Sequence, residues 1–278
     1  MSTLTLFAPA KLNLSLRVLG KREDGFHELD TFMVRLPGLA DQLDFVESGA
    51  FTFHCDEAGV PRDASNLVVK AVRAYETAIG SPCPYSITLK KSIPHGAGLG
   101  GGSSDAASTL LGLDQLHDGR LGAERLHEIA ASLGSDVPFF LGSGAARCTG
   151  RGEIITPAPS PRPLQVVLFK PWFAVPTADA YSRWAESREL PGVRYTAQDL
   201  DGLEIVNDLE RPVFSKHRFL AELKQWLLER DECAAALLAG SGSTVFAVLH
   251  IGANAGHLAK CARHELDPGL WTWTGAVG

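Results

Sequence analysis

The chain has 278 residues, of which 45% are hydrophobic and 21% are charged, and its formal net charge is −6. This composition is typical of a globular protein with a sizeable core and excludes a disordered chain. The acidic balance argues against a nucleic-acid partner, because proteins that bind nucleic acids normally carry a basic surface. The length predicts two domains or one large one.

The cysteines and the N-terminus indicate the compartment. Five scattered cysteines without a Cys-x-x-Cys pair favour a reducing cytoplasm and argue against a disulfide framework or a zinc cluster. The N-terminus lacks the basic region of a signal peptide. The longest uncharged apolar run, 233–249, is interrupted by Gly240, Ser241 and Gly242. We therefore expect a cytoplasmic protein with no membrane partner.

The first hundred residues combine strand and helix patterns. Apolar and polar residues alternate from 3 to 18, which predicts a strand that is bent or divided at Pro9. Apolar residues at helical spacing predict a helix over 66–79. Further strands are predicted at 31–36, 44–46, 51–54 and 85–89.

The remaining chain continues this mixture in two parts. A helix is predicted to begin near Ser103 and another to span 123–133, with Gly134 at its end. Prolines cluster between 156 and 163, which marks a domain boundary. After it we expect strands at 164–169 and 244–249, and helices at 219–228 and 253–263. Both parts therefore belong to an α+β or α/β class.

A glycine-rich loop at 94–102 is the most informative segment, because five of its nine residues are glycine. Glycine lets a ligand approach the backbone closely, and the first amides of the following helix form an anion site. Ser103 and Ser104 are predicted to cap that helix and to offer hydroxyls to phosphate oxygens. The alternative is an ordinary flexible connection. The predicted nucleotide site comprises Pro94, His95, Gly96, Ala97, Gly98, Leu99, Gly100, Gly101, Gly102, Ser103 and Ser104.

Two other phosphate-binding motifs fit less well. A P-loop would need a lysine after the glycines, and none follows. Gly96, Gly98 and Gly101 satisfy G-x-G-x-x-G, but a dinucleotide fold also needs an acid at the tip of a second strand about 20 residues on. That distance falls at 115–118, which no hydrophobic strand precedes. A dinucleotide-dependent oxidoreductase is therefore disfavoured.

Three polar positions have ordinary structural interpretations from the sequence alone. Lys11 and Asn13 lie on the strand face opposite Leu12, which predicts solvent-facing side chains. Asp136 lies two residues before Pro138 and suits a helix N-cap. Asp105 is expected in the first turn after the glycine loop, where an acid favours the helix dipole.

The glycine loop with Ser103 and Ser104 resembles the second signature motif of the GHMP kinases (galactokinase, homoserine, mevalonate and phosphomevalonate kinases). Residues 8–14, Ala-Pro-Ala-Lys-Leu-Asn-Leu, resemble the first motif, and residues 240–246 resemble the third. The triple glycine and the segment 25–29 are most similar to the branch that acts on a cytidyl diphosphate ester of a branched polyol. The resemblance extends from residue 8 to residue 246.

This resemblance implies a two-domain α+β fold. Residues 1–157 would form an N-terminal, ribosomal-S5-like, ATP-binding domain, and residues 164–278 a C-terminal ferredoxin-like α/β sandwich. The site would lie between them, with ATP as phosphoryl donor and Mg²⁺ accompanying it. Lys11 and Asp136 match the family's catalytic pair, in which the carboxylate accepts the hydroxyl proton and the lysine is its electrostatic partner.

The resemblance also implies how the acceptor binds. Phe26 and Tyr181 match two aromatics that sandwich the cytosine, and His27 matches the residue that contacts the base edge. Phe26 stands where the branch typically has tyrosine, so stacking is retained but a hydroxyl hydrogen bond is lost. Asn13 and Thr177 are also assigned to the substrate, and Gly240, Ser241 and Gly242 to the third motif near the phosphates or the acceptor.

The expected activity is ATP-dependent phosphorylation of the 2-hydroxyl of that ester in non-mevalonate isoprenoid synthesis. We expect a monomer or weak homodimer whose partners are ATP and this small molecule. Two alternatives stay open: a GHMP kinase with another acceptor, of the homoserine or mevalonate type, and a nucleotide-binding module without catalysis. The second is disfavoured because both Lys11 and Asp136 are present.

Overall fold

The protein contains two β-sheets that pack face to face. The computed structural model describes residues 3–142 and 144–277. In the first sheet the strand order is β3-β4-β2-β1-β9-β8, with β5 attached to β2 and β6 to β5. Its strands are β1 (Thr3–Lys21), β2 (His27–Glu47), β3 (Thr52–Cys55), β4 (Tyr85–Lys90), β5 (Ala145–Gly150), β6 (Ile154–Ala158), β8 (Gln198–Leu200) and β9 (Leu203–Asn207). The second sheet, in the order β10-β11-β7-β12, contains β7 (Leu164–Lys170), β10 (Cys233–Leu238), β11 (Val245–Leu249) and β12 (Trp271–Val277).

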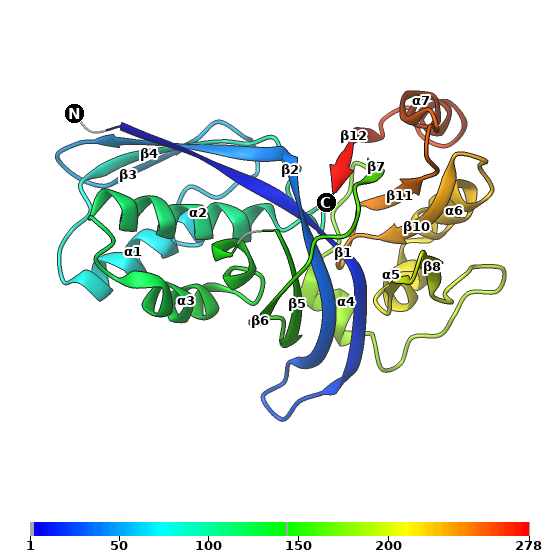
Figure 1. Cartoon of the computed structure of the whole chain (residues 1–278), viewed down its shortest axis with the longest axis horizontal. Helices are drawn as coiled ribbons and strands as arrows, with labels where there is room; N and C mark the ends of the chain where they lie inside the picture. The colour runs from blue at the N-terminus through cyan, green and yellow to red at the C-terminus, as the bar shows by residue number, and fades with distance from the viewer. Residues whose placement is uncertain (1–2, 143, 278) are drawn as a thin grey trace.

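The helices cover the outer faces of the two sheets. Figure 1 shows the first three helices beneath the first sheet and the last two beside the second sheet, at the opposite end of the molecule. Within the described ranges, no helix has both the length and the apolar character needed to cross a bilayer. The helices are α1 (Leu67–Ile79), α2 (Gly101–Leu116), α3 (Gly122–Leu133), η1 (Pro138–Leu141), α4 (Thr177–Ser182), α5 (Glu210–Lys216), α6 (Arg218–Leu228) and α7 (Ala255–Glu265).

Two long antiparallel strands, β1 and β2, form the spine of the first sheet. They pair from Thr3 opposite Val46 to Lys21 opposite His27. Pro9 does not divide β1; the register shifts between Pro9 and Ala10, and the strand continues. The bend predicted at Pro9 is therefore a local irregularity, since proline removes one ladder hydrogen bond without ending the pairing. The strands predicted separately at 31–36 and 44–46 are parts of β2.

The start of α2 differs from the prediction. The helix begins at Gly101, and its N-cap is Gly100 in the left-handed conformation (φ 73°), which provides no side-chain cap. Ser103 and Ser104 lie inside the first turn, so the prediction that they cap the helix was wrong. The glycine turns the chain directly into the helix, and the Ser104 amide already donates to the Gly100 carbonyl.

Two aspartates also differ from their ordinary structural interpretations. Asp136 caps no helix, because the short 3₁₀ helix η1 begins at Pro138 with Val137 at its N-cap. Asp105 lies beyond the first turn of α2, where it forms an ion pair with Lys91 instead of facing the dipole. In both cases a tertiary contact determines the position of the carboxylate.

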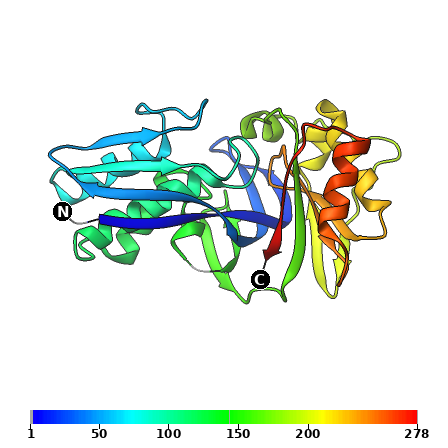
Figure 2. The same ribbon diagram turned by 90° about the horizontal axis from the view of Figure 1, so that it is seen from above.

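Strands β7, β10 and β11 alternate between two apolar cores. Leu168, Leu237 and Phe246 face the first sheet, where they pack with Leu12 and Leu14 of β1. The intervening residues of these strands pack against α6 and α7 on the other face. Figure 2 shows α7 on the outer side of the second sheet. The two halves are thus joined by a continuous apolar layer.

A segment of the second half completes the first sheet. β9 follows the proline cluster in the sequence, yet it pairs in parallel with β1, with Ser15 opposite Val206 and Leu16 opposite Asn207. The Asp208 amide donates to the Leu16 carbonyl, and its carboxylate accepts from the Val18 amide. The chain therefore crosses back over the boundary predicted at 157–164.

Candidate active site

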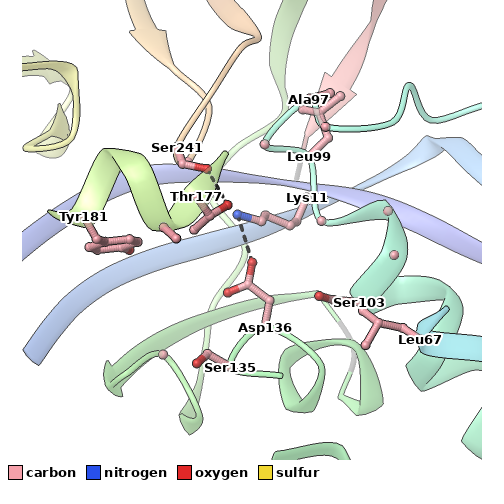
Figure 3. Close-up of a pocket in the computed structure, with 18 of the residues that line it drawn as sticks. Lys11, Leu67, Ala97, Leu99, Ser103, Ser135, Asp136, Thr177, Tyr181 and Ser241 are labelled. Carbon is pink, nitrogen blue, oxygen red and sulfur yellow. Dashed lines mark hydrogen bonds and ion pairs between the residues drawn. The ribbon is translucent and has the colours of Figure 1, made fainter. Parts of the chain in front are cut away.

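A cavity of about 840 Å³ lies where the two halves meet. Its walls come from β1, the glycine loop, the segment before η1, α4 and the loop after β10 (Figure 3). Of the predicted site residues, only Ser104 and Gly242 do not line it. Those that do are Lys11, Asn13, Phe26, His27, Pro94, His95, Gly96, Ala97, Gly98, Leu99, Gly100, Gly101, Gly102, Ser103, Asp136, Thr177, Tyr181, Gly240 and Ser241.

Lys11 and Asp136 meet inside this cavity. The Lys11 Nζ lies 3.3 Å from the Asp136 Oδ2 (Figure 3) and 2.6 Å from the Asn13 Oδ1. Asn13 in turn donates to the Thr31 hydroxyl at 2.8 Å. Lys11 is only 4% exposed, so the prediction of a solvent-facing side chain was wrong. A buried ammonium requires such partners, because desolvation without them is costly.

The glycine loop is held between β1 and the loop after β10. The Lys11 amide donates to the Leu99 carbonyl, and the Thr244 amide donates to the Ala97 carbonyl. Gly98 has a positive φ of 77°, and a Cβ there would lie 2.1 Å from the Ala239 carbonyl oxygen. Gly100 faces the Lys11 side chain, where a Cβ would lie 2.9 Å from Cγ. Close packing therefore requires glycine at both positions.

The N-terminus of α2 opens into the cavity. Gly101, Gly102 and Ser103 line the wall, and their amides precede the first intrahelical partners of a helix that extends to Leu116. Such amides and the helix dipole favour a bound anion. This end of the cavity is suited to phosphate oxygens.

A buried charge cluster that sequence reasoning missed supports the same helix. The Lys91 Nζ contacts Asp41 and lies 2.8 Å from the Asp105 Oδ2. Asp41 also accepts hydrogen bonds from the amides of Ser92 and Ile93, which lead into the glycine loop. Burial raises the pKa of Asp105 to about 7, with Lys91 opposing this shift and Asp41 adding to it. In the sequence, only the position of Lys91 just before the glycine loop could have indicated this cluster.

Aromatic side chains line the other end of the cavity. The rings of His27 and Tyr181 lie 5.3 Å apart, and the Arg151 guanidinium lies 4.6 Å from the centre of the Phe26 ring. Phe26 is 49% exposed, although the Arg151 guanidinium lies over one face of its ring. Burial and the nearby Lys21 charge lower the pKa of His27, which favours its neutral imidazole. Sequence reasoning missed Arg151, which also lines the cavity.

The loop after β10 closes the cavity between these two ends. The Ser241 hydroxyl lies 2.9 Å from the Thr177 hydroxyl at the start of α4 (Figure 3). A Cβ on Gly240 would lie 3.3 Å from the Lys11 Nζ. The cavity thus has an anion-binding end, a lysine–carboxylate pair at its centre and an aromatic end.

Family models match both halves of the chain. The model of the GHMP kinases N terminal domain matches residues 66–144, and that of the GHMP kinases C terminal matches residues 196–263. These ranges include the glycine loop, Asp136 and the loop after β10.

Relatives match over nearly the whole chain. The 4-diphosphocytidyl-2-C-methyl-D-erythritol kinase of Methylacidiphilum infernorum is 40% identical over 270 residues, which cover 95% of this chain and 93% of the relative. That of Deinococcus radiodurans is 39% identical over 282 residues, which cover 98% of this chain and 92% of the relative.

Solved structures have the same fold. A crystal structure of 4-(cytidine 5'-diphospho)-2C-methyl-D-erythritol kinase aligns with a TM-score of 0.79 and 35% identity, and the alignment covers 99% of each chain. The homoserine kinase of Cytophaga hutchinsonii aligns with a TM-score of 0.71 at 17% identity, over 100% of this chain and 95% of that one, and shows the fold alone.

Proposed function

The chain belongs to the GHMP kinase family and is an ATP-dependent phosphotransferase, and we propose that it phosphorylates 4-diphosphocytidyl-2-C-methyl-D-erythritol on its 2-hydroxyl. This reaction is a step of non-mevalonate isoprenoid synthesis. The observation that carries the proposal is the Lys11–Asp136 pair, 3.3 Å apart, between an anion-binding helix end and an aromatic pocket.

Asp136 is the proposed general base. Phosphoryl transfer depends mainly on positioning and on charge stabilisation. A carboxylate within reach of the acceptor hydroxyl accepts its proton as the transition state forms, which typically contributes ~10²–10⁴-fold. The Lys11 ammonium lies against that carboxylate, where it fixes the orientation of Asp136 and offsets charge on the transferring group.

The aromatic end is the proposed cytosine pocket. Phe26 and Tyr181 would stack on the two faces of the base, and stacking of this kind contributes about 1–3 kcal/mol. A neutral His27 offers one ring nitrogen as a donor and the other as an acceptor to the base edge. Asn13 and Thr177, which line the cavity beside Lys11 and Tyr181, are the proposed contacts to the polyol.

Mg²⁺ is the proposed companion of ATP, and the oxygen atoms at the anion-binding end suit it. Mg²⁺ prefers one or two carboxylates together with phosphate oxygens and water. Asp105 lines the cavity, and its Oδ1 is buried without a hydrogen-bond partner among the described residues. Asp105 and the Ser103 hydroxyl would hold the ion, which neutralises phosphate charge when it is bound.

Assembly and location are part of the same proposal. We expect a monomer or weak homodimer in a reducing, cytoplasmic environment, with residues 1–157 and 164–278 as its two domains. All five cysteines are free thiols, and four of them are buried, which supports a reducing compartment. Light scattering coupled to gel filtration measures the assembly state.

ADP release with Mg-ATP and a panel of acceptors tests the proposed substrate. The panel contains the cytidyl ester, the same polyol phosphate without its cytidyl group, mevalonate and homoserine. Turnover with the cytidyl ester alone is expected. Turnover with mevalonate or homoserine instead would keep the chemistry of Lys11 and Asp136 but reject the cytosine pocket. Absence of turnover in protein that still binds ATP would favour a non-catalytic binding module.

A further inference from the structure

The loop after β10 depends on a buried amide outside the cavity. Asn207, the last residue of β9, is 3% exposed. Its Nδ2 donates to the carbonyls of Leu238 and Gly240, at 2.8 and 2.7 Å. Its Oδ1 accepts from the Leu209 amide at 2.9 Å. Both amide hydrogens therefore hold the start of a single turn, where the chain leaves β10.

This turn packs against the glycine loop and the cavity. Within it, the Gly242 amide donates to the Ala239 carbonyl, and the Thr244 amide donates outward to Ala97. A Cβ on Gly240 would lie 3.1 Å from the Gly98 oxygen and 3.3 Å from the Asn13 Oδ1. A shift of the turn by a fraction of an ångström would therefore move neighbours of Lys11.

Asn207 also belongs to the strand that touches β1. β9 pairs with β1 at Ser15 and Leu16, on the same strand that carries Lys11. A single side chain thus connects the strand of the catalytic lysine to the turn that closes the cavity. Through Ser241 the turn reaches Thr177, at the start of the helix that carries Tyr181 (Figure 3).

We propose that Asn207 is a positioning residue for phosphoryl transfer: it fixes the turn at 239–244 against Lys11 and the glycine loop. It does not touch the substrate. The inference rests on the proposed function in one respect: the assay of kcat uses the proposed acceptor, the cytidyl ester. Without the Asn207 amide as donor, the carbonyls of Leu238 and Gly240 would lose their hydrogen bonds, and the turn would relax away from Lys11.

The variant Asn207→Asp keeps the shape of the side chain but removes both donated hydrogen bonds. Its matched control is Gln198→Glu, because Gln198 is 5% exposed and bonds both backbone groups of Ala236 on the same strand, β10. Gln198 does not line the cavity. Both variants lose a buried amide, so both are expected to lower Tm. At a temperature where each stays folded, kcat is expected to fall about 10–100-fold for Asn207→Asp and less than about threefold for Gln198→Glu.

Hydrogen exchange provides a measurement that does not depend on the acceptor. The amides of Gly242 and Thr244 are expected to lose protection in Asn207→Asp and to keep it in Gln198→Glu. The variant Asn207→Ser, which removes the amide without placing a carboxylate against the two carbonyls, is also expected to lower kcat and the protection of the turn, and it serves as the test if Asn207→Asp does not fold. Equal losses of kcat in the Asn207 and Gln198 variants, or unchanged protection of the turn, would overturn the proposal. Failure of the wild-type protein to turn over the cytidyl ester would instead overturn the proposed substrate.

Discussion

Lys11 shows how burial changes the role of a residue that a strand pattern assigns to solvent. The face of β1 that carries Lys11 and Asn13 is covered by the glycine loop and by the turn after β10. A charged group remains there because Asp136 and Asn13 surround its ammonium. The ammonium is buried, whereas the Asp136 side chain keeps 35% of its surface exposed to the cavity, where an acceptor hydroxyl can reach it.

Replacing Asp136 by asparagine is expected to lower kcat by about 10²–10⁴-fold with little change in KM, because the base acts only as the transition state forms. The measurement is steady-state ADP release under saturating Mg-ATP. Asp199→Asn, at an exposed position away from the cavity, is the control. An Asp136→Asn enzyme within twofold of the wild type would reject the assignment of the base.

Replacing Tyr181 by alanine is expected to raise KM for the cytidyl ester, since the loss of one stacking face costs about 1–3 kcal/mol, or roughly 5–150-fold. KM for ATP is expected to stay nearly unchanged, because the phosphate end of the cavity does not contact Tyr181. Tyr195→Ala, the control, removes a tyrosine that packs on Phe214 and does not line the cavity. Equal effects of Tyr181→Ala on the two KM values would contradict the sandwich.

At the scale of elements, the glycine loop and α2 act as one anion-binding unit. Alternate glycines at 96, 98 and 100 have positive φ, and the chain then enters α2 without a side-chain cap. The buried Asp41–Lys91–Asp105 cluster holds the start of this helix against the first sheet. Together with the hydrogen bond from the Thr244 amide to the Ala97 carbonyl, this gives the loop partners from both halves of the chain.

Replacing Gly98 by alanine is expected to raise KM for ATP. The new Cβ would lie 2.1 Å from the Ala239 oxygen, so the loop must move. Gly119→Ala is a matched control, because Gly119 has a similar φ of 72° with no atom within 4 Å of its Cβ. Both variants bear a conformational cost of about 1–2 kcal/mol, so both should lower Tm. An equal KM for ATP in the two variants would show that the close approach is not required.

The raised pKa of Asp105 predicts how the free energy of unfolding depends on pH. Burial raises its pKa in the folded protein to about 7, and in the unfolded chain the value is about 4. At a pH between these two pKa values, the folded protein holds a proton that the unfolded chain has released. The contribution of Asp105 to the free energy of unfolding therefore falls as pH rises through this range. An asparagine side chain at this position would carry no such proton. The stability of the wild type relative to Asp105→Asn is therefore expected to decrease between pH 5 and pH 8 in urea unfolding. A constant or increasing difference would contradict the raised pKa.

At the scale of the whole molecule, the two sheets share one apolar layer. Leu12 and Leu14 of the first sheet pack with Leu168, Leu237 and Phe246 of the second. β9 adds a strand from the second half to the first sheet. Cores that share side chains unfold together, so we expect one cooperative transition.

Tryptophan fluorescence tests this cooperativity, because all five tryptophans follow residue 170 in the sequence. Leu113 lies in the helical core of the first half, and Leu113→Ala is expected to cost about 2–5 kcal/mol. The fluorescence midpoint in urea should fall together with the far-UV signal. Leu19→Ala, at a side chain that is 64% exposed, should change stability by less than about 0.5 kcal/mol. A fluorescence midpoint unmoved by Leu113→Ala would indicate independent domains.

Local sequence patterns predicted much of this fold. Alternation predicted β1 and β4, and β7 was predicted as a buried strand. The helices α1, α6 and α7 were also predicted to within a few residues. The positive φ values of the glycine loop and its position before α2 followed from local chemistry, since only glycine adopts such conformations readily. The family resemblance likewise rested on short motifs, and the match of both family models agrees with it.

The sequence by itself determined the class of fold, the family and most of the segments that form the cavity. The tertiary structure decided which polar side chains are buried: it placed Lys11 against Asp136, moved Asp105 into a pair with Lys91, and brought Asn207 to the turn at 239–244. The physical reason is that local and tertiary interactions join residues at different separations along the chain. Periodicity and turn chemistry act within a few residues, whereas the partners of these buried groups lie 14 positions away for Asp105, 33 for Asn207 and more than a hundred for Lys11.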